Sequence, residues 1–162
     1  MMLTRTMKLA TALIVGALAA PVAAHARPFS GSCQFSGSIT PMPPITLVPG
    51  PGAHFSYVGH GTCTGGLPIT VRFTSVATLF DTCELGPDFD LHGRMRIGRR
   101  RSRITISLAR LAVAGPFVLS DAAGGEGLGV AQFATSSPLL CLSSGIATAT
   151  LSASFQTISP LR

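Results

Sequence analysis

The stretch that decides the fold is residues 147–155, ATATLSASF, in which apolar and hydroxyl-bearing side chains alternate without a break. A period of two places every second side chain on the same face of an extended strand. The same alternation recurs upstream at residues 33–39, CQFSGSI, and at residues 89–97, FDLHGRMRI. These three segments are therefore predicted to be strands with one face in the core and the other in water.

Further strands are expected where short apolar runs lie between turns rich in glycine and proline. These runs are residues 45–48, 53–62, 68–80, 103–113, 117–120 and 127–135. A break in phase at Val76 predicts a β-bulge near Thr74. About eight to nine short strands with turns between them predict an all-β fold, either an antiparallel β-sandwich or a small barrel.

The N-terminal segment has the three parts of a secretory signal peptide. Arg5 and Lys8 are followed by the apolar run LATALIVGALAA, and small residues occupy both ends of Ala24-His25-Ala26. That run is shorter than the ~20 residues that a membrane-spanning helix needs. The sequence therefore predicts a cleaved signal over residues 1–26 and a secreted, extracellular product. The rest, residues 27–162, has the size of a single β domain.

Four cysteines follow the predicted cleavage site, and an even number in an exported domain predicts two disulfides. They are Cys33, Cys63, Cys83 and Cys141. Metal binding is the competing interpretation, but no pair has the C-x2-C spacing of a zinc site. Cys33 and Cys63 both take the inward phase of their strands. This phase predicts a core-spanning bridge between them and leaves Cys83 to pair with Cys141.

The charge balance is basic, with 12 Lys and Arg against 6 Asp and Glu and a net charge of +6. Six arginines gather in one short segment. They are Arg94, Arg96, Arg99, Arg100, Arg101 and Arg103. If the strand turns after Ile97 and returns at Arg103, then Arg94, Arg96 and Arg103 share the outward face of a hairpin. Arg99 to Arg101 would then form its tip.

The arginine hairpin has two interpretations. It is either a binding site for an anionic partner or a solvated turn in an arginine-biased protein. The partners considered are an anionic surface polymer, lipid headgroups and extracellular nucleic acid. Nucleic acid is the weakest of these, because no aromatic residues interleave with the arginines to stack on bases.

Catalytic chemistry has little support in the sequence. There is no G-x-S-x-G elbow, no H-E-x-x-H pair and no phosphate-binding loop with its lysine. His54 and His60 would lie about 20 Å apart on one strand, too far for a shared metal. One acidic group is a candidate acid and base pair or a weak calcium site, but a polar loop that carries a disulfide explains it better, because no second ligand cluster is in sight. Its members are Asp81, Glu84, Asp88 and Asp90. No catalytic residue, metal site or cofactor is assigned.

Two resemblances to known families add to these observations. The order of features along the chain resembles that of uncharacterised exported proteins of high-GC actinomycete bacteria. These features are Gly61-Thr62-Cys63-Thr64-Gly65, a mid-chain Cys83, a glycine pair at 124–125, and Cys141 before the last strand. This resemblance implies secretion and a β-rich fold. The segment LSDAAG at residues 119–124 is similar to the last strands of neocarzinostatin-type chromoprotein carriers. That resemblance implies a two-disulfide, immunoglobulin-like sandwich that holds an apolar ligand.

Three functions follow from these observations. The first is a non-enzymatic extracellular or cell-surface-associated binding module, which needs only a stable β domain and the arginine hairpin. The second is a carrier of a small apolar ligand, which needs a cavity of roughly 300 Å³ or more. The third is a protease inhibitor or hydrolase, which needs converging polar groups or an exposed rigid loop. Outward faces rich in Ser, Thr and Arg predict a monomer.

Overall fold

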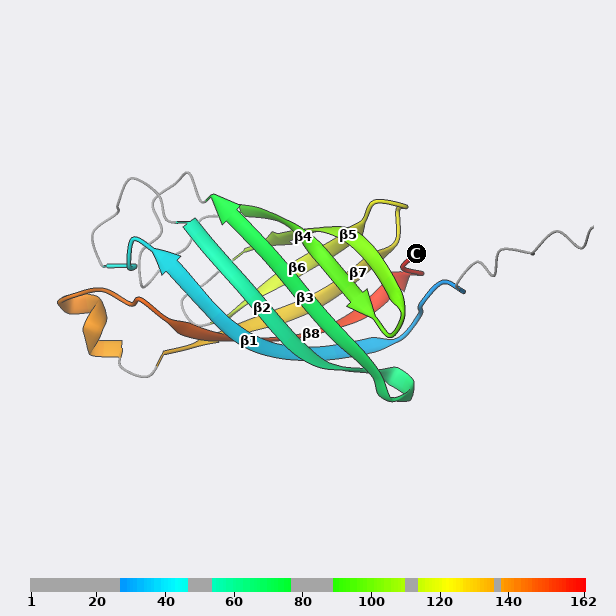
Figure 1. Cartoon of the computed structure of the whole chain (residues 1–162), viewed down its shortest axis with the longest axis horizontal. Helices are drawn as coiled ribbons and strands as arrows, with labels where there is room; N and C mark the ends of the chain where they lie inside the picture. The colour runs from blue at the N-terminus through cyan, green and yellow to red at the C-terminus, as the bar shows by residue number, and fades with distance from the viewer. Residues whose placement is uncertain (1–26, 47–53, 77–88, 110–113, 136–137) are drawn as a thin grey trace, which may run out of the picture.

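The protein forms an eight-stranded antiparallel barrel, shown in Figure 1. The computed structural model describes residues 27–46, 54–76, 89–109, 114–135 and 138–162. The predicted signal peptide, Cys83 and the carboxylates Asp81, Glu84 and Asp88 lie outside these ranges. The strands are β1 (Ser32–Met42), β2 (His54–Cys63), β3 (Leu67–Val76), β4 (Phe89–Ile97), β5 (Arg100–Leu108), β6 (Ala114–Asp121), β7 (Glu126–Ala134) and β8 (Ala149–Ser159). The 3-10 helices are η1 (Thr64–Gly66) and η2 (Pro138–Leu142).

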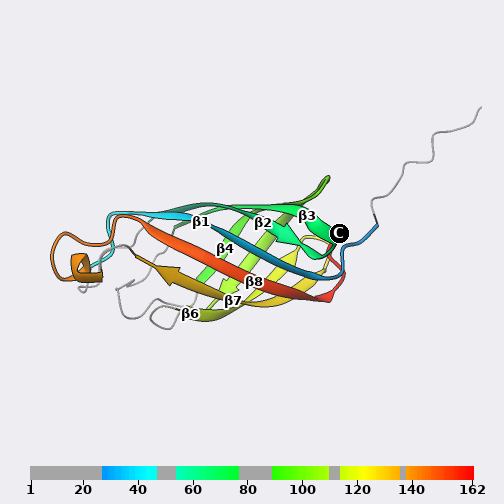
Figure 2. The same cartoon turned by 90° about the horizontal axis from the view of Figure 1, so that it is seen from below.

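Each strand pairs with its neighbours in the chain, and β1 pairs with β8 to close the sheet. The closing ladder runs from Ser32 opposite Gln156 to Ile39 opposite Ala149. The strands cross the long axis of the molecule at a tilt, which Figures 1 and 2 show from two sides. Closure leaves no edge unpaired among the eight described strands. Of the two predicted architectures, the barrel is therefore the one observed, and the sandwich implied by the chromoprotein resemblance is not.

Two local predictions are corrected. Residues 45 and 46 are not in a strand, and Ile45 instead forms an isolated bridge to Ile146. The bulge predicted near Thr74 is wrong, because β3 pairs with β2 in unbroken register along its whole length. The alternation of apolar residues in the sequence breaks at Val76, which is the last residue of β3, so the break marks the end of the strand. Among the described strands, a register irregularity lies between Glu126 and Gly127 of β7.

The barrel interior is filled by a chain of aromatic rings from different strands. Tyr57 stacks on Phe73 with ring centroids 4.7 Å apart. Phe35 lies 6.2 Å from Tyr57 and 6.4 Å from Phe155, and Phe155 lies 6.5 Å from Phe117. All five side chains are buried. Eight strands give a barrel just wide enough for side chains to fill. The inward phase of the strands therefore builds a packed aromatic core.

Glycines on the inward phase make room for these rings. A Cβ on Gly129 would lie 2.5 Å from Cζ of Phe117, and one on Gly59 would lie 2.1 Å from Oη of Tyr57. The Tyr57 hydroxyl donates a hydrogen bond to the Leu151 carbonyl oxygen at 3.2 Å. Burial raises the pKa of Tyr57 above its usual range, so the hydroxyl keeps its proton and stays a donor.

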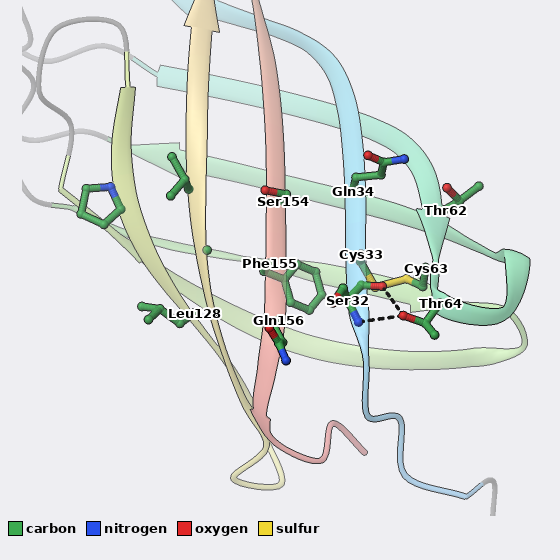
Figure 3. A pocket seen from close by; sticks show the side chains of 13 residues that line it. Ser32, Cys33, Gln34, Thr62, Cys63, Thr64, Leu128, Ser154, Phe155 and Gln156 are labelled. Atoms are coloured by element: carbon green, nitrogen blue, oxygen red, sulfur yellow. Dashed lines mark hydrogen bonds between the residues drawn. A yellow bond between two sulfur atoms is a disulfide. The ribbon is translucent and has the colours of Figure 1, made fainter.

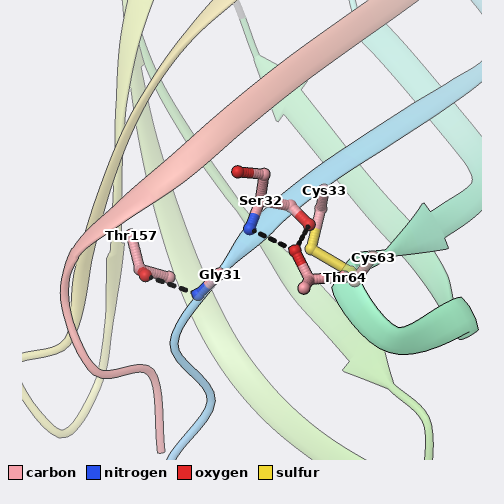
Figure 4. Close-up of a disulfide and its surroundings, with 6 residues drawn as sticks. All are labelled: Gly31, Ser32, Cys33, Cys63, Thr64 and Thr157. Carbon is pink, nitrogen blue, oxygen red and sulfur yellow. Dashed lines mark hydrogen bonds between the residues drawn. A yellow bond between two sulfur atoms is a disulfide. The ribbon is translucent and has the colours of Figure 1, made fainter.

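The Cys33–Cys63 disulfide is confirmed, although it does not span the core (Figure 4). Cys33 of β1 lies directly opposite Cys63 of β2, with Cα atoms 3.9 Å apart. The bridge therefore joins neighbouring strands on the inner side of the wall. Beside it, the Thr64 hydroxyl oxygen accepts a bond from the Ser32 amide at 2.9 Å. Closing a loop with a sequence separation of 30 should stabilise the fold by about 3.6 kcal/mol.

The second predicted bridge involves Cys83, which lies outside the described residues. Cys141 is buried at the end of the barrel that carries η2, away from the C-terminus (Figure 1). No cysteine in the described part of the chain is free. The pairing of Cys83 with Cys141 stays a prediction.

The C-terminal segment closes the other end of the barrel. Leu161 is 2% exposed and exchanges two backbone hydrogen bonds with Phe29, at 2.8 and 2.9 Å. Asp121 is buried, and its carboxylate accepts bonds from the amides of Ala123, Gly125 and Arg162. Three donors satisfy the charge of this carboxylate, which burial would otherwise make costly.

Candidate anion-binding site

The arginine hairpin exists, but its turn is tighter than predicted. β4 ends at Ile97 and β5 begins at Arg100, so Gly98 and Arg99 alone connect them. Gly98 has a φ of +58°, a value that glycine adopts without strain. The expected tip of three arginines is therefore corrected, because Arg100 and Arg101 belong to β5. The sequence contains a signal that Arg101 lies on the strand. Ile104 takes the inward phase, and alternation traced back from Ile104 places Arg101 on the outward face.

The pairing of β4 with β5 sets the positions of four arginines. Arg94 lies opposite Arg103, and Arg96 lies opposite Arg101. All four side chains are exposed. The predicted outward position of Arg94, Arg96 and Arg103 is confirmed, and Arg101 joins them on the same face.

A fifth arginine, which was not predicted to belong to the site, comes from β3. Arg72 lies directly opposite Arg94 on the neighbouring strand and is exposed. It is far from the other arginines in the sequence, so composition alone could not associate it with them. Two observations could have indicated that Arg72 belongs to the site. It takes the outward phase between the buried residues Val71 and Phe73, and consecutive strands of such a fold pair with each other.

These five arginines line one hollow of about 680 Å³ on the outer wall of the barrel. We call them the arginine sector: Arg72, Arg94, Arg96, Arg101 and Arg103. The remaining lining residues are His60, Thr70, Met95 and Ser102. This lining holds no carboxylate, and within the part of the chain that the structure describes no ion pair neutralises these arginines.

Arg99 and Arg100, also predicted as site residues, lie next to the hollow but do not line it. Arg99 is exposed in the turn, whereas Arg100 takes the inward phase of β5 and is half-buried. The structure therefore brings Arg94, Arg96, Arg101 and Arg103 together and leaves Arg99 and Arg100 at the margin.

The arginine sector has an unfavourable internal electrostatic energy. Like charges lie directly opposite each other at Arg72 with Arg94, Arg94 with Arg103, and Arg96 with Arg101. Each such pair costs roughly 0.2 to 1 kcal/mol when no counter-charge is near. An anion in the hollow would remove this repulsion.

Two hydrogen bonds order the rim of the hollow. Arg96 donates from Nε to the Gly98 carbonyl oxygen at 2.8 Å, which fixes its guanidinium and leaves the terminal nitrogens available. His60 and Thr70 are joined through Nδ1 and Oγ1 at 3.3 Å. The site is thus partly organised before any ligand arrives.

A second hollow, of about 740 Å³, lies over β1, β2, β8, β7 and the adjoining part of β6 and differs in chemistry (Figure 3). Uncharged side chains line it, among them Gln34, Thr62, Ser154 and Gln156, with Leu128 at its edge. Its lining contains no arginine and no carboxylate. An anion should therefore prefer the arginine sector to this uncharged hollow.

The remaining candidate groups do not converge. His54, His60 and His92 are all exposed, and His92 Nδ1 lies 3.2 Å from the Thr105 hydroxyl. The described residues contain no group of three or more His, Cys, Asp or Glu that could hold a metal ion. Asp90 is the one member of the predicted acidic group that the structure describes, and it accepts a hydrogen bond from Ser107.

An apolar strip on β6 and β7 departs from the expected polar surface. Val118 lies opposite Leu128 and Pro116 opposite Val130, with exposures of 39, 53 and 49% for Val118, Leu128 and Val130. The premise of the monomer prediction, outward faces made of Ser, Thr and Arg, therefore does not hold on these two strands. No helix in the described residues has the length and the apolar character that crossing a membrane requires.

The fold and the site define the class of molecule as an eight-stranded up-and-down barrel with a basic sector on its outer wall. No family model, curated protein or solved structure matches the chain at a significant level. The chemistry of the site is therefore the basis on which a function can be proposed.

Proposed function

We propose that the protein is an exported, non-enzymatic module that binds an anionic partner through the arginine sector. One observation carries this proposal. Five arginines from three adjacent strands face one hollow whose lining has no carboxylate. A concentration of positive charge of this kind attracts anions and raises their rate of association.

The electrostatic cost of the arginine sector supports the same conclusion. Three cross-strand arginine pairs repel each other, and a solvated surface without a ligand gains nothing from that arrangement. Among the described residues, Asp121 is held by backbone amides, Asp90 accepts a hydrogen bond from Ser107, and neither of them nor Glu126 lines the hollow. A bound anion supplies the missing counter-charge.

Export is supported by the N-terminal signal pattern in residues 1–26 and by the Cys33–Cys63 disulfide. Disulfides persist in oxidising compartments and are rare in the cytosol. A second disulfide between Cys83 and Cys141 belongs to this proposal. The partners that fit are an anionic surface polymer or clustered anionic headgroups.

Nucleic acid fits less well. Single-stranded nucleic acid binds to exposed aromatic side chains on which its bases stack. The rings of Tyr57, Phe35, Phe73, Phe117 and Phe155 are all turned into the barrel core, and none of them lines the hollow. The lining of the hollow therefore offers contacts to phosphate or carboxylate groups but no phenyl or phenol ring on which bases could stack.

The test is the affinity of the protein for immobilised dextran sulfate as a function of salt. We expect binding to weaken by about 100- to 500-fold between 50 and 200 mM salt when all five arginines are neutralised, because each neutralised arginine releases counterions. Arg94→Gln/Arg103→Gln should lower affinity at least about tenfold at 50 mM salt, since it removes two of the five charges.

The matched control is Arg27→Gln/Arg99→Gln, which removes the same charge from two exposed arginines outside the hollow. It should change affinity by no more than about twofold. Equal losses in the two double variants would show that net charge alone attracts the polymer. Absence of binding by the unaltered protein would refute the proposed function.

A further inference from the structure

We infer that the arginine sector selects ligands in which several phosphoryl groups lie close together, as in a condensed phosphate chain. This inference rests on the proposed function and narrows it to one ligand chemistry. It concerns the spacing of the charges and the geometry of their hydrogen-bond donors.

The sheet arranges the five arginines as a compact grid. Arg72, Arg94 and Arg103 form one row across three strands, and Arg96 and Arg101 form a second row two residues away along β4 and β5. Neighbours within a row are about 5 Å apart at Cβ, and the rows are about 7 Å apart. The five charges therefore originate from a patch about 10 Å across.

Charge density in the ligand must match this grid. A carboxylated polysaccharide carries one charge on each sugar ring, so a single chain crossing the patch leaves most of the arginines unpaired. A condensed phosphate carries a charge on every phosphoryl group, with one bridging oxygen between neighbours. Such a ligand brings enough charge into the hollow to pair with both rows.

The donors also match phosphate oxygens. A guanidinium presents parallel N–H groups that bind two oxygens of one phosphate, and these charge-assisted bonds are stronger than neutral ones. The bond from Arg96 Nε to Gly98 holds one such group in place before binding. The hydroxyl of Thr70 lines the same hollow and adds an uncharged group, whereas the Ser102 hydroxyl donates to the carbonyl oxygen of Arg162.

The hollow offers nothing to an apolar part of a ligand. Met95, the one apolar side chain in its lining, is 3% exposed. An acyl chain would therefore find no apolar contact surface there. The same phosphate chemistry occurs in soluble condensed phosphates and in lipid headgroups with adjacent phosphates, and binding to vesicles separates the two.

The experiment is calorimetric titration of the protein with orthophosphate, pyrophosphate, tripolyphosphate and citrate at one fixed ionic strength. We expect affinity to rise about tenfold with each added phosphoryl group, as an additional charge-assisted contact allows. Citrate, which carries three carboxylates, should bind at least about tenfold more weakly than tripolyphosphate. Equal affinity for citrate and tripolyphosphate would overturn the inference and leave the proposed function standing. Failure of every one of these anions to bind would also overturn the inference, and binding to dextran sulfate then decides separately whether the proposed function stands.

A pair of charge-conserving variants tests the role of guanidinium geometry. Arg96→Lys keeps the charge but loses the planar donor group, and it should reduce the preference for tripolyphosphate over citrate about tenfold. Arg99→Lys is the matched control outside the hollow and should leave the preference unchanged. An equal preference for tripolyphosphate over citrate in the two variants would contradict selection by guanidinium geometry.

Vesicles that contain an inositol bisphosphate lipid identify the source of the phosphates. Binding at least about tenfold tighter than to tripolyphosphate would assign the site to a headgroup, since a surface displays many ligands at once. Binding to vesicles that is less than about tenfold tighter than binding to tripolyphosphate would assign the site to a soluble phosphate. Either result supports the clustered-phosphate chemistry, whereas vesicle binding that tripolyphosphate cannot displace would contradict it.

Discussion

Replacement of Phe155 by alanine is expected to lower the free energy of unfolding by about 4 kcal/mol. Phe155 is 3% exposed and links the Phe35 and Phe117 rings across the barrel interior. Its removal deletes a large buried surface and leaves a cavity between strands that the closed sheet cannot easily draw together. Denaturant unfolding monitored by circular dichroism measures the change.

The control for this substitution is Gln156→Ala, the next residue on β8. Gln156 faces outward and is exposed, so its loss should change stability by less than about 0.5 kcal/mol. A loss below about 1 kcal/mol for Phe155→Ala would mean that the interior is not packed as described. It would also favour the second function considered, a barrel that encloses a small apolar ligand.

Charge reversal within the arginine sector is expected to have the largest effect on binding. Arg94→Glu/Arg101→Glu should reduce affinity for tripolyphosphate at least about 100-fold, because the sector changes from five positive charges to three positive and two negative. The stability of the fold should not decrease. The new carboxylate at 94 would lie between Arg72 and Arg103, and the one at 101 would lie opposite Arg96.

The measurements are a calorimetric titration and a thermal melt of the same variant. Opposite charges across strands stabilise a sheet, so the melting temperature should stay the same or rise. A variant that melts normally and still binds tripolyphosphate with the original affinity would show that the anion does not occupy the arginine sector.

Alternation in the sequence predicted the inner and outer faces of the wall. It placed Phe155 and Cys33 inward and Arg94 outward, and the structure has them so. Alternation does not say which strands pair, since a sandwich and a barrel use the same period. The contact of β1 with β8 that closes the barrel joins distant parts of the chain, and no local pattern records it.

The same limit explains which residue of the site could not be predicted. The cluster between residues 94 and 103 was visible as composition, but Arg72 joins it only through the register of β3 with β4. Arg100 was assigned to the tip, although it takes the inward phase together with Ser102 and Ile104. The hydrophobic phase of β5 is therefore a better guide to the site than the run of arginines.

The most direct test of anion binding by the arginine sector is a two-dimensional NMR titration of the protein with tripolyphosphate. We expect the largest shift changes at the amides of Arg72, Arg94 and Arg103, in β3, β4 and β5. Little change is expected at Gln34 and Ser154, which line the uncharged hollow on β1 and β8. The largest changes at Gln34 and Ser154, or changes spread evenly over the barrel, would contradict a binding site in the arginine sector.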